Sequence, residues 1–404
     1  MNQKTSQTRR LKNDRYGRDQ SSIKKKQTTA VQGRKPVSGV LELHPDGYGF
    51  LRDHRNNYLA TPGDPFVPQR MMETLSLRAG IRIEGVSKAT DSRKGNRLIE
   101  INDVDGISAD AFRSVRQIES LTPVNPRDQI QLETGPESVS MRVIDLLTPL
   151  GKEQRALIVA PPRSGKTMLL RQIANSVAEN YPNIVLLGLL VDERPEEVTE
   201  MQMALHGELL ASTLDCDPES HVRLSQLVVQ RCHRLVELGH DVVLLADSLT
   251  RLARAFNKMP WVQGSLGPGG LKTRALEIPK RLFASARAFR EGGSLTIVAT
   301  ALVDTQNRMD EAIYQEFKGT GNMEVVLDEQ LAERRVWPAM DVTKSKTRRD
   351  ELLLDTKTLD AVTLLRRSLA SMNHVEAMER LTDQLARFQS NTEFIDRISA
   401  ASSL

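Results

Sequence analysis

One stretch, from Ala156 to Thr167, limits the fold of this 404-residue chain more than any other. An apolar run of strand length, Ala156–Ala160, passes directly into the loop Pro161-Pro-Arg-Ser-Gly165 and then into a predicted helix. Backbone N–H groups of such a loop, together with the N-terminus of the helix that follows, surround the phosphates of a nucleotide. We therefore expect an α/β domain that binds a nucleotide at the carboxyl edge of a parallel sheet.

The residues of this loop match the P-loop pattern, with Ala160 in place of its first glycine. Gly165 allows a close backbone approach to the phosphates. Lys166 is expected to reach the β- and γ-phosphates, and the Thr167 hydroxyl is expected to bind Mg²⁺. With Arg163 and Ser164, these residues form the predicted phosphate-binding loop.

Three further apolar runs of strand length suit the middle of a parallel sheet covered on both faces: Val185–Val191, Val242–Ala246 and Leu295–Ala301. Asp247 ends one of them and is expected to support the Mg²⁺ shell. Glu193, beside Asp192, follows another, and we expect it to orient or deprotonate the attacking water. The alternative for this acidic segment is a solvated turn. Four stretches have the pattern of crossover helices, namely Thr167–Ala178, Glu196–Leu210, His221–Leu238 and Pro279–Arg290.

Residues 37–106 have a different pattern from the rest. Five short runs, separated by turn-forming clusters, predict the strands of a small all-β barrel of the oligonucleotide-binding (OB) or cold-shock type. These runs are Val37–Leu43, Gly49–Arg52, Phe66-Val67, Ile81–Val86 and Leu98–Val104. We expect residues 107–139 to form a connector and residues 140–404 to form the nucleotide-binding domain, closed by C-terminal helices.

Charge is concentrated at the N-terminus, where residues 1–35 hold eleven Lys or Arg against two Asp. We expect residues 1–36 to be a disordered tail that either keeps the chain in solution or binds phosphates. The two cysteines, Cys216 and Cys232, have no metal-ligand spacing and indicate a reduced compartment. Because no apolar run is long enough to cross a bilayer, we expect a cytoplasmic protein without a membrane partner.

Four segments of the sequence resemble the Rho family of transcription termination factors: Val191–Met201, Asp247–Phe256, Gly292–Ala301 and Glu316–Glu324. The resemblance runs from about Val37 to the C-terminus. It implies a homohexameric ring in which an RNA-binding barrel precedes a RecA-like ATPase domain. It also implies that ATP hydrolysis drives movement along single-stranded RNA, and that bacterial RNA polymerase is a functional partner.

The resemblance assigns further residues to the nucleotide site. Arg348 corresponds to an arginine finger inserted into the neighbouring subunit, and Arg335 to a second arginine that acts across that interface. Trp337 stands where the family stacks an aromatic ring on adenine, and Met168 packs on the other side of the base. Without the resemblance, a core tryptophan near a chain reversal is the favoured alternative for Trp337. The remaining residues implied at this site are Arg194, Gly151, Lys152, Glu153, Gln154, Arg155 and Ala156.

Two regions are implied to bind RNA. On the predicted strand around Gly49, alternate residues face one side, so Tyr48, Phe50 and Arg52 share a surface on which bases stack. The alternative is that the aromatic rings fill the barrel core. The full set implied here is Gly47, Tyr48, Gly49, Phe50, Leu51, Arg52, Asp64, Pro65 and Phe66. The second region consists of two pore loops with the implied contacts Leu266, Gly269, Gly270, Lys272 and Arg308; an ordinary mobile loop is the alternative for the first of them.

The sequence departs from the family pattern in several places. A basic tail replaces the usual helical subdomain before the barrel, and the P-loop has Arg163-Ser164 where Lys-Ala is frequent. The first pore loop contains Pro268 and Lys272, which change its stiffness and charge. Three other classes compete with this interpretation: an RNA-binding regulator that uses nucleotide only as an assembly switch, a rotary ATP synthase subunit, and a DNA recombinase.

Overall fold

The computed structural model describes residues 34–90, 95–125 and 127–402. The N-terminal barrel has the five predicted strands. They are β1 (Arg34–Leu43), β2 (Gly49–Arg52), β3 (Phe66–Val67), β4 (Arg82–Ala89) and β5 (Asn96–Val104), closed in the order β1-β2-β3-β5-β4. Leu41, Leu51 and Ile83 are among the side chains that fill its centre. β1 starts three residues before the predicted barrel, and the rest of the predicted basic tail lies outside the described residues.

The large domain is built on a nine-stranded sheet whose main strands follow the order β14-β13-β7-β12-β10-β8-β9. All neighbouring pairs from β13 to β9 are parallel, and β14 is antiparallel to β13. The bounds are β7 (Arg155–Ala160), β8 (Val185–Glu193), β9 (Glu208–Thr213), β10 (Asp241–Asp247), β12 (Ser294–Leu302), β13 (Met323–Val326) and β14 (Lys346–Thr347). Short β6 (Pro123–Val124) and β11 (Ala288–Phe289) complete the sheet.

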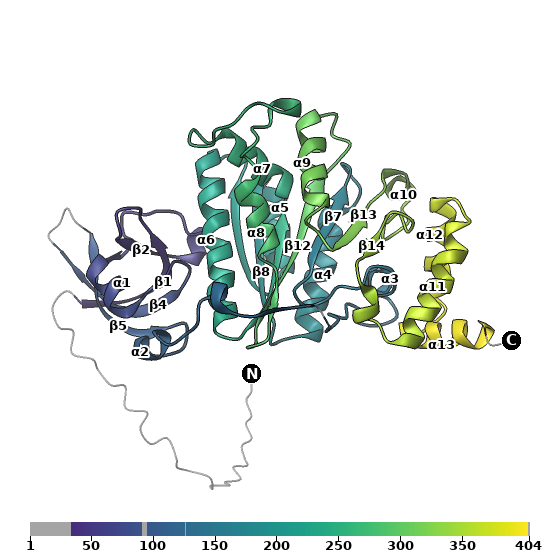
Figure 1. Cartoon of the computed structure of the whole chain (residues 1–404), viewed down its shortest axis with the longest axis horizontal. Helices are drawn as coiled ribbons and strands as arrows, with labels where there is room; N and C mark the ends of the chain where they lie inside the picture. Colours follow the sequence, from purple (N-terminus) through teal and green to yellow (C-terminus); the bar gives the residue numbers. More distant parts are fainter. Residues whose placement is uncertain (1–33, 91–94, 126, 403–404) are drawn as a thin grey trace, which may run out of the picture.

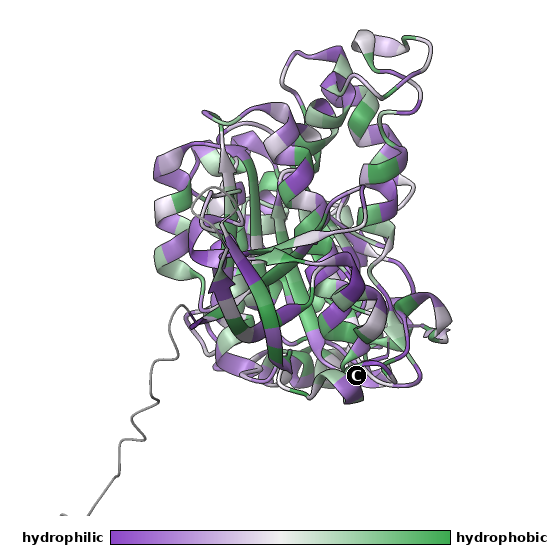
Figure 2. Ribbon diagram, turned by 90° about the vertical axis from the view of Figure 1, so that its left-hand side faces the viewer, coloured by the Kyte–Doolittle hydropathy of each residue, from purple (hydrophilic) through white to green (hydrophobic). Residues whose placement is uncertain are grey.

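Helices cover both faces of this sheet, so each face has its own apolar core. One core includes residues of α3 (Val139–Leu147), α4 (Lys166–Asn180), α5 (Pro195–Ala204) and the C-terminal helices. The other includes residues of α6 (Pro218–Glu237), α7 (Leu249–Lys258), α8 (Glu277–Ala284) and α9 (Arg308–Lys318). Figure 2 shows mainly hydrophobic strands surrounded by helices with hydrophilic outer turns. In the described part of the chain, no helix has both the length and the apolarity needed to cross a membrane.

Two predicted helices were too long. The stretch Glu196–Leu210 is helical only to Ala204, because Gly207 brings the backbone against Leu186, and the chain continues as the buried strand β9. A Cβ on Gly207 would lie 2.2 Å from the Leu186 carbonyl oxygen. The stretch Pro279–Arg290 is helical to Ala284 and ends in β11. The sequence analysis also missed β13 and β14.

The barrel packs beside α6 at one side of the large domain, and the C-terminal helices lie at the other (Figure 1). These helices are α11 (Thr356–Ala370), α12 (His374–Leu385) and α13 (Asn391–Ser402). The smaller elements are α1 (Gln69–Leu75), α2 (Ala109–Phe112) and α10 (Glu329–Glu333), with 3-10 turns at His54–Asn56, Ile118–Ser120, Pro268–Gly270 and Asp350–Leu352.

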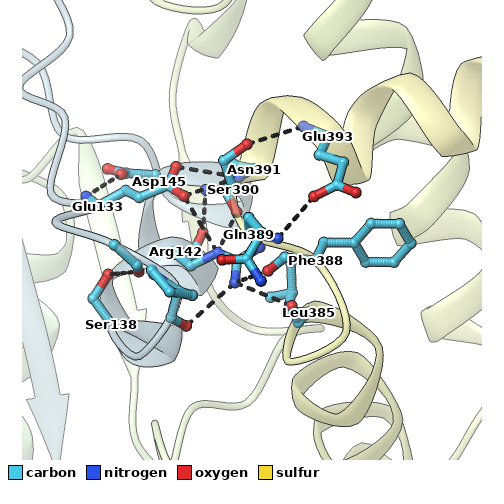
Figure 3. Close-up of polar contacts among 12 residues, drawn as sticks. Glu133, Ser138, Arg142, Asp145, Leu385, Phe388, Gln389, Ser390, Asn391 and Glu393 are labelled. Carbon is cyan, nitrogen blue, oxygen red and sulfur yellow. Dashed lines mark hydrogen bonds and ion pairs between the residues drawn. The ribbon is translucent and has the colours of Figure 1, made fainter.

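A buried arginine fastens the C-terminal helices to α3 (Figure 3). The Arg142 side chain is fully buried, and its Nη1 donates to the carbonyl oxygens of Leu385 (3.0 Å) and Phe388 (2.9 Å). Asn391, at the start of α13, donates from Nδ2 to the Arg142 carbonyl at 3.0 Å, and Glu133 forms an ion pair with Arg142 at 3.4 Å. Because these carbonyls lie at the end of α12 and just beyond it, one side chain satisfies groups that a helix end leaves unpaired.

We predict that Arg142→Met destabilises the C-terminal helices, because it leaves buried carbonyl groups without a donor. The expected loss is about 3 kcal/mol, at the lower end of values for broken buried pairs, and the expected fall in melting temperature is roughly 5 °C or more. Thermal unfolding monitored by circular dichroism measures it. Arg380→Met, on the exposed side of α12, is the matched control and should leave the melting temperature nearly unchanged. An equal effect of the two variants would contradict this account of Arg142.

Candidate nucleotide and RNA sites

The P-loop joins β7 to α4 at the carboxyl edge of the sheet. Gly165 stands at the N-cap of α4 with a φ of 85°, a conformation that favours glycine. The Trp337 ring packs directly against it, since a Cβ on Gly165 would lie 2.4 Å from Cζ3 of Trp337. Trp337 therefore borders the P-loop. Because the residue is only half-buried, part of its surface stays accessible.

Lys166 lies between the two predicted carboxylates. Its Nζ is 2.7 Å from Oδ1 of Asp247 and 3.1 Å from Oε1 of Glu193. The sequence analysis missed two neighbours of these carboxylates. Thr300 of β12 donates its hydroxyl to Asp247 at 2.7 Å, and Arg251 of α7 lies 3.3 Å from Oε2 of Glu193. The alternative of a solvated turn is therefore wrong for Glu193, whose side chain is 1% exposed.

This burial changes the proton affinity of both partners. Burial, reinforced by the negative charge of Asp247, raises the pKa of Glu193 to about 7, although Lys166 and Arg251 oppose the shift. Burial alone would lower the pKa of Lys166, but the charges of Asp247 and Glu193 outweigh it and raise the pKa above its usual value. Lys166 therefore stays charged at neutral pH, whereas Glu193 can exchange a proton there.

The side-chain oxygens of Thr167 and Asp247 suit a Mg²⁺ ion that is held mainly by a nucleotide. The described residues contain no group of three or more His, Cys, Asp or Glu side chains that could hold a metal ion by themselves. Mg²⁺ commonly takes only one or two protein ligands and completes its shell with phosphates and water. Thr167 follows Lys166 at the start of α4, and Asp247 contacts Lys166 directly. The Thr167 hydroxyl also lies 3.4 Å from Oε2 of Glu197, a neighbour that the sequence analysis missed.

The arginines predicted for the nucleotide site lie at two edges of the sheet. Arg194 is exposed at the N-cap of α5, on the P-loop edge. Arg335 is exposed two residues before Trp337, near the same edge, so it lies on the P-loop side of its own chain and not beside Arg348, although both were expected to act across the interface. Arg348 is exposed at the opposite edge, where its backbone N–H donates to Asn322 at 2.8 Å, just before β13 starts. Met168 is half-buried in the first turn of α4.

The segment from Gly151 to Ala156 lies at the other end of β7 from the P-loop. Arg155 is the first residue of β7, whereas the P-loop follows the last residue, Ala160. Six strand residues separate the two ends by roughly 20 Å, so this segment does not line the P-loop site of its own chain. It lies instead on the edge that carries Arg348; burial and the nearby positive charges of Arg287 and Arg348 lower the pKa of Arg155. The segment consists of Gly151, Lys152, Glu153, Gln154, Arg155 and Ala156.

Three aromatic rings form an open cluster on the barrel. The ring centroids of Tyr48, Phe50 and Phe66 are 5.4 to 5.9 Å apart, and each ring is half-buried. The barrel core is filled by other side chains, so the alternative that these rings form the core is wrong. His44 stacks on Tyr48 at 4.3 Å across the hairpin turn, and Arg97 lies 6.0 Å from the Phe66 ring. The sequence analysis assigned no role to His44 or Arg97. For His44 a signal was present, because the turn between His44 and Tyr48 predicts that these two rings face each other.

The other predicted RNA residues of the barrel have mixed positions. Arg52 places its guanidinium 4.8 Å from the Phe50 ring centroid and forms an ion pair with Asp64 at 2.5 Å. Gly49 leaves no room for a side chain, because a Cβ there would lie 2.7 Å from Leu41. Leu51 is a correction, since its side chain is 1% exposed in the core. Gly47 forms the hairpin turn with a φ of 87°, and Pro65 precedes β3.

The two predicted pore loops lie against each other. Gly269 touches the start of α9 so closely that a Cβ would lie 2.3 Å from the Met309 nitrogen. Asn257 holds the first loop by donating to the Gly270 carbonyl at 3.2 Å and accepting from the Lys272 backbone at 2.8 Å. The Lys272 ammonium donates to the Met259 carbonyl at 3.2 Å, so it is turned toward its own loop. Leu266 and Arg308 are exposed.

Comparison with known proteins identifies both domains. Residues 37–110 match the Rho termination factor, RNA-binding domain, and residues 140–347 match the ATP synthase alpha/beta family, nucleotide-binding domain. The transcription termination factor Rho of Aquifex aeolicus is 46% identical over 369 residues, covering 90% of this chain and 85% of that protein. The factor of the same name from Cereibacter sphaeroides is 47% identical over 367 residues, covering 89% and 86%.

Two solved structures have a similar fold. A type III secretion system ATPase of pathogenic bacteria has a TM-score of 0.55 and 21% identity, covering 64% of this chain and 83% of that chain. An ATP synthase subunit from Nanoarcheaum equitans has a TM-score of 0.56 and 18% identity, covering 72% and 80%. These likenesses establish the fold of the nucleotide-binding domain.

The pKa of Glu193 leads to a prediction about pH. If Glu193 accepts a proton from the attacking water, kcat/KM for ATP should rise with pH and level off above about 7, because this ratio reports groups of the free enzyme. Steady-state ATP hydrolysis between pH 5.5 and 9 measures the profile. Glu193→Gln should have little activity and no such rise. A wild-type profile that is flat between pH 6 and 8 would contradict the role.

Proposed function

This chain belongs to the Rho family of transcription termination factors, and from this premise we propose how its residues bind RNA, hydrolyse ATP and promote termination by RNA polymerase. It is an ATP-hydrolysing enzyme with an RNA-binding domain. One observation carries the proposed residue roles. The same chain has an open aromatic cluster on its barrel and a buried Lys166–Glu193–Asp247 cluster at the P-loop.

At the nucleotide site, Lys166 binds the β- and γ-phosphates, and the backbone of the P-loop surrounds them. When ATP binds, its phosphates compete for the Lys166 ammonium, which in this structure is shared between Glu193 and Asp247 and partly offsets their charge. Glu193 then orients the attacking water and accepts its proton, while Arg251 keeps the carboxylate in place. Thr167 and Asp247 would hold Mg²⁺, which would supply positive charge next to the phosphates. Trp337 stacks on adenine.

The position of Arg348 supports a site shared between chains. Arg348 lies about one strand length from the P-loop of its own chain, so it cannot reach that nucleotide without a large rearrangement. An exposed arginine at one edge and a P-loop at the other are complementary surfaces of the kind that closes a ring. We infer a homohexamer in which Arg348 completes the neighbouring site, with Arg194 and Arg335 lining the P-loop side.

RNA contacts occur at two places in this proposal. Bases stack on Tyr48, Phe50 and Phe66 of the barrel, and Arg52 contacts a base edge or phosphate. The exposed Leu266 and Arg308 face RNA in the ring channel, and movement of their loops during hydrolysis pulls the strand. RNA polymerase is the functional partner, which locates the protein in the cytoplasm.

The decisive experiment measures ATP hydrolysis without polymer, with cytidine-rich RNA and with single-stranded DNA of equal length. Strong stimulation by RNA that disappears in Glu193→Gln is expected. Phe50→Ala should raise the RNA concentration for half-maximal stimulation roughly tenfold, because stacking contributes ~1–3 kcal/mol per base. Phe50→Trp keeps a stacking face and should stay close to wild type. If neither RNA nor DNA changed the rate of ATP hydrolysis, the RNA-driven motor would be excluded. The protein would then be an RNA-binding regulator that uses nucleotide only as an assembly switch.

A second prediction concerns the shared site. Arg348→Ala should lower RNA-stimulated kcat by at least about a hundredfold, since an arginine finger contributes ~10³–10⁵ to the rate, while ATP affinity is largely kept. Arg349→Ala changes the neighbouring exposed arginine and should retain activity. Mixing Arg348→Ala with Lys166→Ala before assembly should restore some turnover, because each chain supplies what the other lacks. Unchanged activity of Arg348→Ala alone would exclude the role.

A further inference from the structure

Glu42, near the end of β1, connects the aromatic cluster of the barrel with the large domain. Its Oε2 accepts from Nε of Arg52 at 2.5 Å, and its Oε1 lies 2.6 Å from Nε of Arg223, on α6. Arg223 also donates from Nη2 to Oε2 of Glu42 at 3.1 Å and to the backbone carbonyl of Tyr58. One carboxylate therefore holds two guanidinium groups, one from each domain.

Arg223 also determines the net charge behind the base-stacking surface. Arg52 lies between two carboxylates, those of Glu42 and Asp64, and their side chains are only 17% and 8% exposed. These three groups alone have a net charge of −1, which opposes the approach of RNA phosphates. Arg223 brings the cluster of four groups to neutrality. The side chain that removes this excess negative charge thus belongs to the large domain.

The surrounding interface keeps Arg223 in register with the barrel. The Tyr58 hydroxyl donates to Glu208 of β9 at 2.5 Å, and Asn57 accepts from the Ala211 backbone at 2.8 Å. Farther along α6, Gly80 packs so tightly that a Cβ would lie 2.4 Å from the Gln230 carbonyl carbon. These contacts on both sides of the arginine fix α6 against the barrel, where Figure 1 also shows it.

We propose that Arg223 is a positioning residue for RNA recognition. Through the shared Glu42 carboxylate, Arg223 orients Arg52 and neutralises the charged cluster behind the base-stacking surface. The affinity of the barrel for RNA therefore depends on the docking of the barrel to the large domain. The proposal rests on the proposed function, in which the Tyr48–Phe50–Phe66 surface binds RNA. Linkage makes the effect reciprocal. RNA that engages Arg52 must stabilise the docked barrel by the same factor.

The same helix also reaches the nucleotide edge. Two residues before Arg223, α6 carries His221, whose Nδ1 lies 2.7 Å from the Ser212 hydroxyl and whose Nε2 lies 3.8 Å from Asp192. Asp192 immediately precedes the catalytic Glu193. A shift of α6 that accompanies RNA binding would therefore act on residues next to the catalytic carboxylate.

The test compares RNA binding by full-length variants without nucleotide, using a fluorescent cytidine-rich RNA. Arg223→Met should weaken binding on the order of tenfold, the effect expected when a hydrogen bond to a charged group is lost. Arg223→Lys should recover part of the affinity because it restores the charge. The matched control is Arg78→Met. Arg78 also crosses from barrel to large domain, at 3.0 Å from Glu237 of α6, but about 20 Å farther along that helix.

A double variant separates positioning from docking. Glu42→Gln combined with Arg223→Met removes both members of the bridge and leaves Arg52 paired with Asp64, so it should bind RNA better than Arg223→Met alone. The proposal fails if Arg78→Met weakens binding as much as Arg223→Met, if Arg223→Met binds like wild type, or if the double variant is weaker still. Failure of the wild-type protein to bind RNA would instead overturn the proposed function itself.

Discussion

The structure depends on one electrostatic constraint, the burial of two carboxylates and one ammonium group at the carboxyl edge of a parallel sheet. Glu193 ends β8 and Asp247 ends β10, and these strands are direct neighbours. Two carboxylates that are nearly inaccessible to water repel each other, and the Lys166 ammonium offsets this repulsion. Because the cluster is balanced only while Lys166 remains between the carboxylates, a phosphate group that attracts Lys166 leaves Glu193 more ready to hold a proton. The geometry that stabilises the free protein is thus compatible with the role of proton acceptor that we propose for Glu193.

The direction of the parallel strands also explains why the P-loop and Arg348 lie at opposite edges of the sheet, so that a complete nucleotide site would need two chains. Every parallel strand delivers its last residue to the P-loop edge and its first residue to the opposite edge. Arg155 and Arg348 therefore lie together on an edge that contains no P-loop, where burial and then the positive charges of Arg287 and Arg348 lower the pKa of Arg155. Glu153 is the carboxylate that opposes this shift, and a concentration of buried arginines is costly unless anionic groups approach it. We interpret this edge as the surface that meets the nucleotide of a neighbouring subunit.

The sequence predicted those parts of the molecule that local patterns determine. The five barrel strands and the P-loop were predicted because each has a short, self-contained signal of turns or motif residues. β9 was missed because Glu208–Thr213 follows a helix so closely that one apolar pattern runs through both, and only the contact of Gly207 with Leu186 separates them.

Arg251 and Thr300 were missed because their roles arise from contacts between strands and helices far apart in sequence. The edge on which the Gly151–Ala156 segment lies could not be read from the sequence, because proximity to the P-loop in sequence does not specify the edge of the sheet. The bridge from Glu42 to Arg223 joins residues 181 positions apart, so no local pattern could indicate it.

The charge balance of the barrel bears on how it distinguishes bases. A pocket with excess positive charge would attract any phosphate backbone, because counterion release acts on all sequences alike. Here the two arginines closest to Phe50 and Glu42, namely Arg52 and Arg223, are matched by two carboxylates, so these four groups add little general attraction. The contacts left to act on RNA are directional. They are three ring faces for stacking and one guanidinium fixed by Glu42 and Asp64. Because fixed donors discriminate among base edges while stacking tolerates every base, the neutral cluster favours selection over simple retention of the strand. Since α6 supplies one of the four charges, that selectivity requires the barrel to be docked on the motor that moves the RNA.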